Sequence, residues 1–329
     1  MELLELAKEV ASCIQAWGPK TDEEFLSLAQ AIAEAQGRLL CEPVPEGAFK
    51  LMSVACFPPS KAEAVFLSSG TTGATRSRHL IHDLALYRLS AMAGFRHFCL
   101  YPPMPRQVIT LIPEASKRPQ SSLSHMVSFI LEEGWERPPV IGREGERLAL
   151  EKVESALLLA HSSDLPVLLL GTTLDFLALF EGLSVPCPLP PGSRIMHTGG
   201  AKARGKEVDR QEFIAQVGEY LGIPPDDVVE EYGMTELLSQ AYDAPRVSGG
   251  KRRFVPVPWM RSKVLDPRTM EEVALGEEGL LCHHDLANVY TAVAILTEDL
   301  AVRAEDGFFS VRRAPTASPR GCSQEAAES

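Results

Sequence analysis

Apolar residues recur at every third or fourth position in the first forty residues of the chain. The pattern covers residues 3–17 and 23–39, and it places the apolar side chains on one face of a helix. We therefore expect two amphipathic helices here, packed by their apolar faces on the body of the protein.

The pattern changes near residue 64, where short apolar runs begin to alternate with amphipathic stretches. The apolar runs predict buried strands at residues 64–67, 108–113, 166–171 and 194–200. The amphipathic stretches predict helices near residues 82–98, 124–133, 151–160 and 207–221. Alternation of this kind is typical of an α/β layer built on a largely parallel sheet.

The last third of the chain carries apolar runs that are separated by turn residues. They predict a small β-rich part, with short strands within residues 255–266, 279–286, 294–300 and 308–313. The polar residues 316–329 are expected to be mobile. The predicted organisation has four parts: an N-terminal helical segment (1–60), an α/β core (61–245), a β-rich subdomain (246–313) and a flexible C-terminal tail (314–329) that carries Cys322.

The composition is ordinary for a folded protein, with 329 residues, 45% of them hydrophobic and 23% charged, and a formal net charge of -12. An acidic surface of this size argues against nucleic acid or an anionic membrane as the main partner. Seven cysteines without a C-x-x-C pair fit a reducing compartment. The acidic N-terminus and the lack of a long apolar run argue against a signal peptide and a membrane span. We therefore expect a cytoplasmic protein.

The strongest local signal is FLSSGTTGATRSRH at residues 66–79. A predicted strand leads into a loop of glycines and hydroxyl residues, and Arg76 and Arg78 follow. Glycines let backbone N–H groups approach a polyanion, hydroxyls donate to phosphate oxygens, and guanidinium groups neutralise charge. The alternative is a Ser/Thr-rich surface turn. The residues assigned to the phosphate loop are Ser69, Gly70, Thr71, Thr72 and Gly73.

The second signal is EEYGMTE at residues 230–236. The ring of Tyr232 would stack on a purine, and the hydroxyl of Thr235 would reach a phosphate. The carboxylate of Glu236 would hold Mg²⁺ together with phosphate oxygens. Alone, the string also fits an ordinary strand end and helix start, so its weight comes from its place downstream of the hydroxyl loop.

Two weaker signals accompany these. HTGG at residues 197–200 follows a predicted strand, and Gly199 and Gly200 would let a backbone edge meet a flat ring. The alternative is a plain strand-to-helix turn. LTEDL at residues 296–300 contains Asp299, whose carboxylate would accept hydrogen bonds from both ribose hydroxyls. The alternative is a surface acid in a turn.

Taken together, these motifs resemble the acyl-adenylate-forming superfamily, which includes acyl-CoA ligases, firefly luciferase and peptide-synthetase adenylation domains. Finer details resemble one branch, the acyl-protein synthetases of bacterial luminescence, also called long-chain-fatty-acid–luciferin-component ligases. Those details are SSGTTG followed by RSRH, SSLSHM at residues 121–126, HTGGAKARGKEVDRQEF at residues 197–213 and RGCS at residues 320–323. The resemblance implies an α/β fold with mostly parallel sheets flanked by helices, plus a small β-rich part.

The resemblance also implies roles for the motif residues. The hydroxyl loop would hold the phosphates of ATP, with Arg76 where many relatives carry lysine. Gly199 and Gly200 would line the adenine, Tyr232 would stack on it, and Asp299 would hold the ribose. Thr235 and Glu236 would handle phosphate and Mg²⁺. Members of this family form a fatty acyl-AMP, move the acyl group to their own cysteine, here Cys322, and pass it to a partner reductase.

One departure concerns the C-terminal domain that brings a lysine to the acyl phosphate in most superfamily members. No lysine follows Lys263 here, so we expect that domain to be absent or truncated. Either another cation acts in adenylation, or the chain is a fragment. The candidate cations are Lys202, Arg76, Arg312 and Arg313; the glycine expected before an arginine is missing at the last two.

Two other functions stay open at this stage. A CoA or carrier-protein ligase for acyl or aryl acids would share the adenylation step and differ in the acceptor, and Cys322 would then be an inert thiol on a mobile tail. A non-catalytic nucleotide-binding scaffold would share only the fold. The acid's chain length, the final acceptor and the oligomeric state are not fixed by the sequence. His79 and His82 are interpreted as helix-start residues, and His125 as either a pocket residue or a packing residue.

Overall fold

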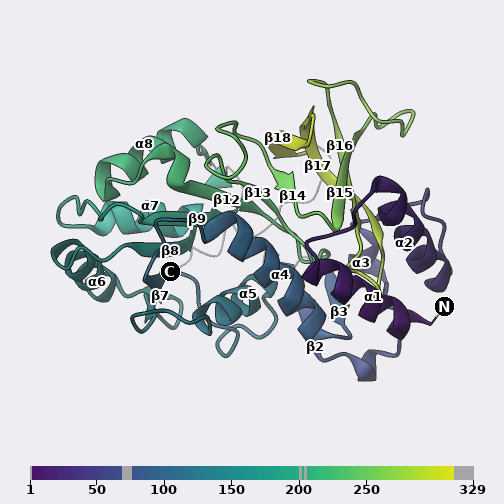
Figure 1. The fold of residues 1–329 in the computed structure, drawn as a ribbon, viewed down its shortest axis with the longest axis horizontal. Coiled ribbons are helices and arrows are strands. Elements are labelled where there is room, and N and C mark those ends of the chain that lie inside the picture. Colours follow the sequence, from purple (N-terminus) through teal and green to yellow (C-terminus); the bar gives the residue numbers. More distant parts are fainter. Residues whose placement is uncertain (1, 69–75, 200–201, 204–205, 315–329) are drawn as a thin grey trace.

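A seven-stranded sheet forms the centre of one half of the protein, in a computed structural model that describes residues 2–68, 76–199, 202–203 and 206–314 (Figure 1). Its strand order is β14-β13-β12-β9-β8-β4-β5. Five neighbouring strands, β12, β9, β8, β4 and β5, run parallel, and β13 and β14 are antiparallel. The bounds are β4 Gln107–Thr110, β5 Val140–Ile141, β8 Val167–Thr172, β9 Arg194–Thr198, β12 Val228–Tyr232, β13 Ala241–Asp243 and β14 Val255–Pro256. The predicted α/β layer with a largely parallel sheet is confirmed.

Helices cover both faces of this sheet, because successive side chains of a strand point to opposite faces. Leu168 and Leu170 of β8 pack in one core with α4 (Leu84–Cys99) and α5 (Ser122–Leu131). Val167 and Leu169 pack in a second core, whose helices are α6 (Leu150–Ser162), α7 (Thr173–Gly182) and α8 (Arg210–Leu221). The near-continuous apolar sequence of these strands is thus buried on two sides.

Four of the helices around the sheet, α4, α5, α7 and α8, begin where a side chain accepts a hydrogen bond from a free backbone N–H group. Asp83 caps α4, Ser121 caps α5 and Asp209 caps α8. At α7, Thr172 and Asp175 form a reciprocal capping box. The helices predicted near residues 82–98, 124–133, 151–160 and 207–221 are confirmed with shifts of up to three residues at their ends, whereas α7 was not predicted.

A second sheet makes up the β-rich part, at the upper right of Figure 1. Its order is β1-β17-β16-β15, with β18 also paired to β17. The bounds are β1 Val44–Pro45, β15 Met260–Leu265, β16 Glu278–Asp285, β17 Ala294–Ala304 and β18 Gly307–Arg313. The predicted strands are confirmed, although β17 is longer than expected. The N-terminal β1 runs parallel to β17 and extends this sheet from the other end of the sequence.

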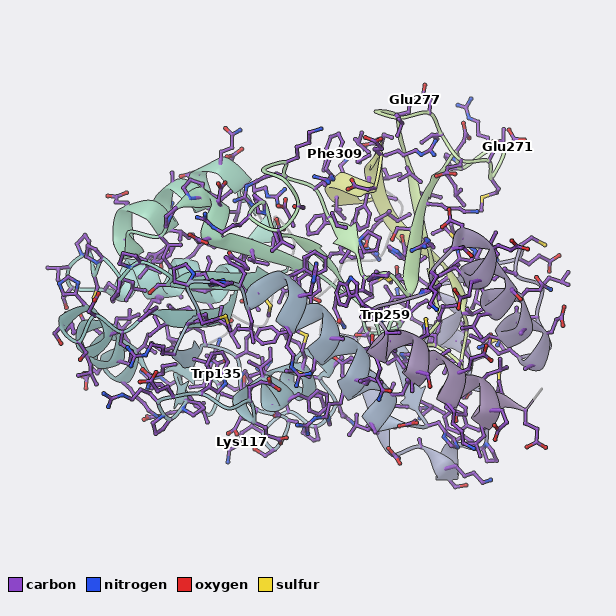
Figure 2. The ribbon with its side chains drawn as sticks, in the orientation of Figure 1. Lys117, Trp135, Trp259, Glu271, Glu277 and Phe309 are labelled. Atoms are coloured by element: carbon purple, nitrogen blue, oxygen red, sulfur yellow. The ribbon has the colours of Figure 1, made fainter. Side chains whose placement is uncertain are left out.

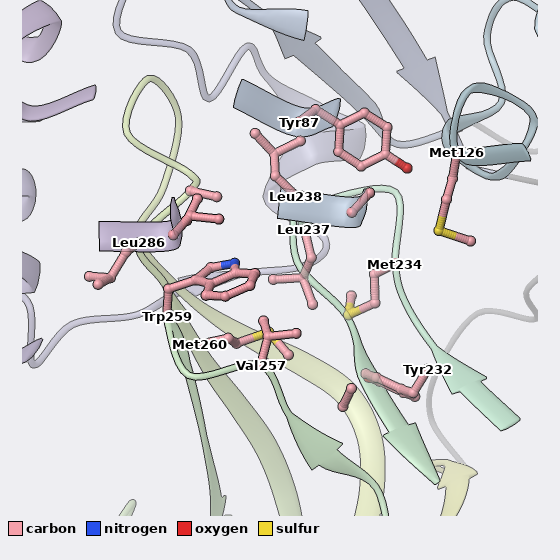
Figure 3. Close-up of a cluster of buried hydrophobic side chains, with 14 of the residues drawn as sticks. Tyr87, Met126, Tyr232, Met234, Leu237, Leu238, Val257, Trp259, Met260 and Leu286 are labelled. Carbon is pink, nitrogen blue, oxygen red and sulfur yellow. The ribbon is translucent and has the colours of Figure 1, made fainter. Parts of the chain in front are cut away.

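The N-terminal segment packs on the rest of the molecule through a continuous apolar core. It contains α1 (Leu3–Gln15), α2 (Asp22–Ala35) and the short helix α3 (Ala48–Leu51), so the two predicted N-terminal helices are confirmed. Trp259 is fully buried in this core near Val257, Met260 and Leu286 (Figure 3). Charged side chains such as Glu271 and Glu277 lie at the periphery (Figure 2).

The predicted strand at residues 64–67 forms, but outside the large sheet. This strand, β2 (Ala64–Leu67), pairs only with β3 (Arg78–Ile81), in an antiparallel two-stranded sheet. His79 lies within β3 and not at a helix start, which corrects the sequence-based interpretation. None of the helices in the described ranges is long and apolar enough to cross a membrane.

Candidate nucleotide site

The motif residues gather at the carboxyl ends of the central parallel strands, where α/β sheets bind ligands. Thr198 at the end of β9 is paired in register with Glu231 of β12 on one side and with Thr172 of β8 on the other. Gly199 follows β9 with a φ of 100°, a conformation that favours glycine. No atom of the described residues lies within 4 Å of where its Cβ would stand, so among these residues the positive φ is the reason for glycine.

A short relay fixes the backbone at Gly199. The hydroxyl of Thr173, in the first turn of α7, donates to the Gly199 carbonyl (3.2 Å) and lies 3.0 Å from Nδ1 of His197. Because that hydroxyl gives its proton to the carbonyl, Nδ1 of His197 must be the donor of the second bond. Burial, with help from Arg210 and Arg252, lowers the pKa of His197 to about 3. The imidazole is therefore neutral near pH 7, as this hydrogen-bond pattern requires.

The loop after β12 carries Thr235 and Glu236 and is held through its backbone. The Glu236 carbonyl accepts a hydrogen bond from the Asn288 side chain (2.9 Å). Asp285 accepts hydrogen bonds from the backbone N–H groups of Leu238 and Ser239 (both 2.9 Å) and from the Ser239 hydroxyl (2.6 Å). Burial raises the pKa of Asp285 to about 6 against these hydrogen bonds. The loop thus has a fixed path over the β-rich part.

His79 connects the first motif to the second. Its Nδ1 donates to the carbonyl of Thr235 (2.8 Å), and its Nε2 accepts from the hydroxyl of Thr291 (3.0 Å). The ring is buried, and burial lowers the pKa of His79 to about 4. The neutral ring is the form that donates at one nitrogen and accepts at the other. Sequence reasoning missed this role, because the two partners of His79 lie 156 and 212 positions away in the sequence.

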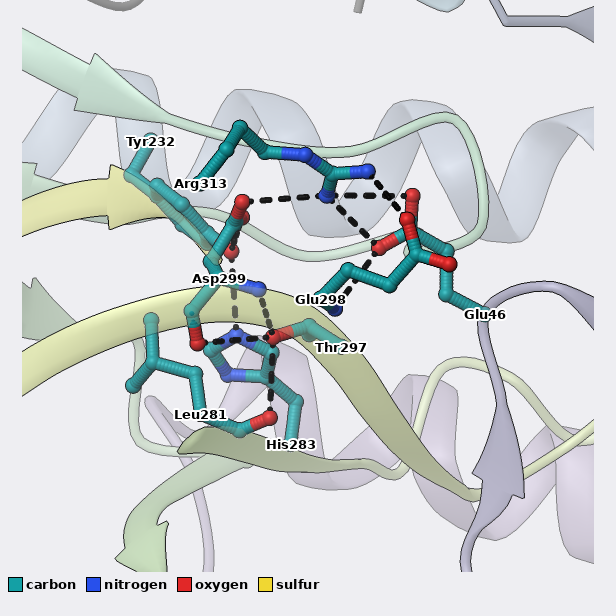
Figure 4. A network of polar contacts seen from close by, with 8 residues as sticks. All are labelled: Glu46, Tyr232, Leu281, His283, Thr297, Glu298, Asp299 and Arg313. Atoms are coloured by element: carbon teal, nitrogen blue, oxygen red, sulfur yellow. Dashed lines mark hydrogen bonds and ion pairs between the residues drawn. The ribbon is translucent and has the colours of Figure 1, made fainter. Parts of the chain in front are cut away.

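Tyr232 and Asp299 are brought into direct contact. The Tyr232 hydroxyl donates to Oδ2 of Asp299 at 2.8 Å, and Nε2 of His283 lies 3.4 Å from the same hydroxyl (Figure 4). The ring of Tyr232 lies among Phe254, Phe308 and His283. Tyr232 is 8% exposed and Asp299 is 2% exposed. Stacking on adenine and binding of ribose stay predictions for these two residues.

The two arginines at the end of β18 face opposite ways, as neighbours on a strand do. Arg313 contacts Oδ1 of Asp299 (3.1 Å), whereas Arg312 forms an exposed ion pair with Glu278 (2.6 Å). Of the two candidate cations at this position, only Arg313 adjoins the predicted ribose acid.

The remaining predicted residues are placed as follows. Glu236 is 2% exposed and Arg76 is exposed just before β3. The ring of His125 lies 5.1 Å from that of Phe66, and its Nε2 donates to the Pro119 carbonyl. The residues that lie outside the described part are Ser69, Gly70, Thr71, Thr72, Gly73, Gly200 and Cys322, and the side chain of Lys202 is also outside it.

One further acid at these strand ends has an unusual charge state. Glu231 of β12 is 6% exposed, and burial, opposed by a hydrogen bond with Thr198, raises its pKa to about 7. Burial thus favours the neutral, protonated form of this carboxyl group. The residues that the structure describes contain no group of three or more His, Cys, Asp or Glu side chains that could hold a metal ion.

Known proteins resemble this chain in sequence and in fold. Residues 150–329, more than half of the chain, match the family described as "Acyl-protein synthetase, LuxE". The long-chain-fatty-acid–luciferin-component ligase of Vibrio harveyi is 28% identical over 135 residues, which are 38% of this chain and 34% of the relative. The protein of the same name from Aliivibrio fischeri is 35% identical over 81 residues, 22% of this chain and 21% of the relative. The matches thus span about a third and a fifth of these relatives.

Solved structures align with a larger part of this chain than the two sequence relatives do. ATP-bound MatB from Rhodopseudomonas palustris aligns with a TM-score of 0.55 and 16% identity, over 78% of this chain and 49% of that one. The O-succinylbenzoate coenzyme A synthetase MenE from Bacillus subtilis, in complex with AMP, aligns with a TM-score of 0.53 and 17% identity, over 78% and 50%. The chain has the adenylate-forming fold over about half of such proteins, and by its matched family it belongs to the LuxE acyl-protein synthetases.

Proposed function

We propose that this protein activates a carboxylic acid, of the fatty class, with ATP to give an acyl-AMP and then transfers the acyl group to its own Cys322. The observation that carries the proposal is the 2.8 Å hydrogen bond between Tyr232 and Asp299. These residues are 67 positions apart and are the ones predicted to contact the adenine and ribose of one nucleotide. Their convergence supports a single nucleotide site at the ends of β9 and β12, next to Asp299 in the middle of β17.

In the first step, a carboxylate oxygen of the acid bonds to the α-phosphorus of ATP, and the bond from that phosphorus to the pyrophosphate oxygen breaks. The protein contributes position and charge neutralisation, which dominate catalysis of such displacements. The relay from His197 through Thr173 holds Gly199 for the flat base. The hydrogen bond from His79 to the Thr235 carbonyl holds Thr235 for phosphate contact.

Magnesium fits the donor set on the same loop. Mg²⁺ prefers oxygen ligands and is bound by one or two carboxylates together with substrate phosphates. Glu236 supplies a carboxylate beside the hydroxyl of Thr235, and such a site needs no larger cluster of protein ligands. When bound, Mg²⁺ would neutralise charge on the phosphates.

In the second step, the Cys322 thiolate attacks the acyl carbon, a thioester forms, and AMP leaves with the electron pair of the broken anhydride bond. The sequence places Arg320 two residues away, and a nearby guanidinium favours the thiolate. A partner such as an acyl reductase would then take the acyl group. The name of the Vibrio harveyi relative, a long-chain-fatty-acid ligase, supports the choice of a fatty acid.

Intact-protein mass spectrometry after incubation with ATP, Mg²⁺ and a panel of fatty acids tests the proposal. We expect an acyl mass increment on the wild type that hydroxylamine removes and that Cys322→Ser lacks. The matched control is Cys41→Ser, because Cys41 is an exposed free cysteine, and it should acquire the same increment as the wild type. AMP formation without an increment would indicate a CoA or carrier-protein ligase. Absence of both would indicate a non-catalytic scaffold.

A further inference from the structure

Glu46 is a buried acid that none of the sequence motifs includes. Its side chain is 3% exposed, and it lies before residues 150–329, which match the family. A buried carboxylate is costly unless charged or hydrogen-bonding groups compensate it. Its partners therefore indicate what it does.

The backbone of β1 delivers Glu46 to the predicted ribose acid. Val44 and Pro45 pair in parallel register with Ile295 and Leu296 of β17, and the Glu46 N–H donates to the Leu296 carbonyl (2.8 Å). Oε2 of Glu46 then accepts from the backbone N–H of Glu298 (3.1 Å). Because Glu298 directly precedes Asp299, Glu46 is anchored to the segment that carries the ribose acid.

Arg313 joins the two acids (Figure 4). Its Nη1 lies 3.1 Å from Oε2 of Glu46 and 3.1 Å from Oδ1 of Asp299, and its Nη2 contacts Glu298 (2.6 Å). The side chains of Glu46 and Asp299 are each 3% exposed and that of Arg313 is 18% exposed. Two carboxylates this deeply buried repel each other unless a cation lies between them. The position of Arg313 is thus set by Glu46 as much as by Asp299.

We propose that Glu46 is a positioning residue of the nucleotide site, which shares Arg313 with Asp299 and so sets how Asp299 accepts the ribose hydroxyls of ATP. The inference rests on the proposed function and adds a residue from the N-terminal segment to the site. With Glu46 in place, Arg313 is held between the two acids. Without the charge of Glu46, the Arg313 guanidinium loses one of its acidic partners, interacts more strongly with Asp299 and competes with the ribose for the same carboxylate oxygens.

The test is Glu46→Gln, which keeps the shape of the side chain and removes its charge. Acid-dependent ATP–pyrophosphate exchange is measured with ATP, 2′-deoxyATP and 3′-deoxyATP. We expect KM for ATP to rise about tenfold with kcat little changed, as for loss of one charge-assisted hydrogen bond. The penalty should shrink toward onefold with a deoxynucleotide, because the affected hydroxyl is absent. A residue that only stabilised the fold would affect all three nucleotides equally.

The control is Glu278→Gln, which removes the same kind of ion pair from Arg312, the neighbour of Arg313, and should leave all three KM values unchanged. Glu46→Asp keeps the charge and provides a second variant, expected to retain more ribose discrimination than Glu46→Gln. Equal effects of Glu46→Gln on all three nucleotides, or none at all, in an active enzyme would overturn this proposal alone. A wild type that neither exchanges pyrophosphate nor binds ATP would overturn the proposed function and this inference with it.

Discussion

Replacing His79 by phenylalanine tests whether its buried imidazole holds the loop that carries Thr235 and Glu236. The phenyl ring keeps most of the volume next to Phe49, whose ring centroid lies 5.5 Å from that of His79. It leaves the Thr235 carbonyl and the Thr291 hydroxyl without their present partner. Each buried polar group left unsatisfied costs about 1–3 kcal/mol, so at pH 7.5 we expect the free energy of unfolding to fall by about 2–4 kcal/mol.

The pH dependence makes this prediction sharper. The pKa of His79 is about 4 in the folded protein, below its usual value of 6.5, so the unfolded chain binds the proton more readily. The stability that the neutral ring contributes is complete above pH 6.5 and is lost as the pH falls toward 4. Between pH 7.5 and pH 5 the wild type loses about 2 kcal/mol through this group, and the variant loses nothing there. The stability gap between them should shrink by that amount.

Urea unfolding followed by tryptophan fluorescence at pH 7.5, 6 and 5 measures the gap. Only the difference between the proteins is informative, since Asp285, Glu231 and His197 also have shifted pKa values. His161→Phe serves as the control for the exchange itself, because His161 is exposed, and at pH 7.5 it should change stability by less than about 0.5 kcal/mol. A gap for His79→Phe that stays constant from pH 7.5 to 5 would refute the reasoning.

Two further predictions concern the strand end that leads into the loop. Burial raises the pKa of Glu231 to about 7, above its usual 4.5, so the contribution of Glu231 to stability is largest at low pH and declines as the pH rises to 7. In urea unfolding, the stability of Glu231→Gln should therefore rise by about 2–3 kcal/mol relative to the wild type between pH 5 and pH 8. A difference in stability that does not change with pH would contradict this pKa. At Gly233 an added Cβ would overlap Oε1 of buried Glu231, so Gly233→Ala should lower stability by about 1–3 kcal/mol in thermal unfolding. Gly134→Ala, where none of the described residues has an atom within 4 Å of the added Cβ, should change stability little.

The large sheet and most of its helices could be predicted because their periodicity is local. The apolar sequence of β8 and the apolar stripes of α4 and α6 are readable from a few residues each. The helix α7 was missed because it follows β8 without a break and the two read as one apolar stretch, although Thr172 and Asp175 formed a recognisable capping signal. The pairing of β2 with β3 could not be predicted from the sequence, because an apolar run indicates a buried strand but not the strand with which it pairs.

The same difference between local and long-range information applies to the candidate site. The motifs identified Tyr232 and Asp299 as members of one site, and the structure brings them into contact. His79 acts through Thr235, 156 positions away, and Asp285 through backbone groups 46 and 47 positions away. Glu46 acts through partners 252 and 267 positions away. Such roles depend on the tertiary fold and leave no periodic or local signal in the sequence.

The pairing of β1 with β17 has a consequence for the order of folding. Val44 pairs with Ile295. Because 295 minus 44 is 251, the partner of Val44 is synthesised 251 residues later. At roughly 5–20 residues per second, the ribosome needs on the order of 10 to 50 seconds to make that stretch. During this time Glu46 has been synthesised, but neither the strand that anchors it nor Arg313 has. The group of Glu46, Asp299 and Arg313 can therefore form only after Arg313 has been synthesised, and β1 lacks its partner strand for that whole interval.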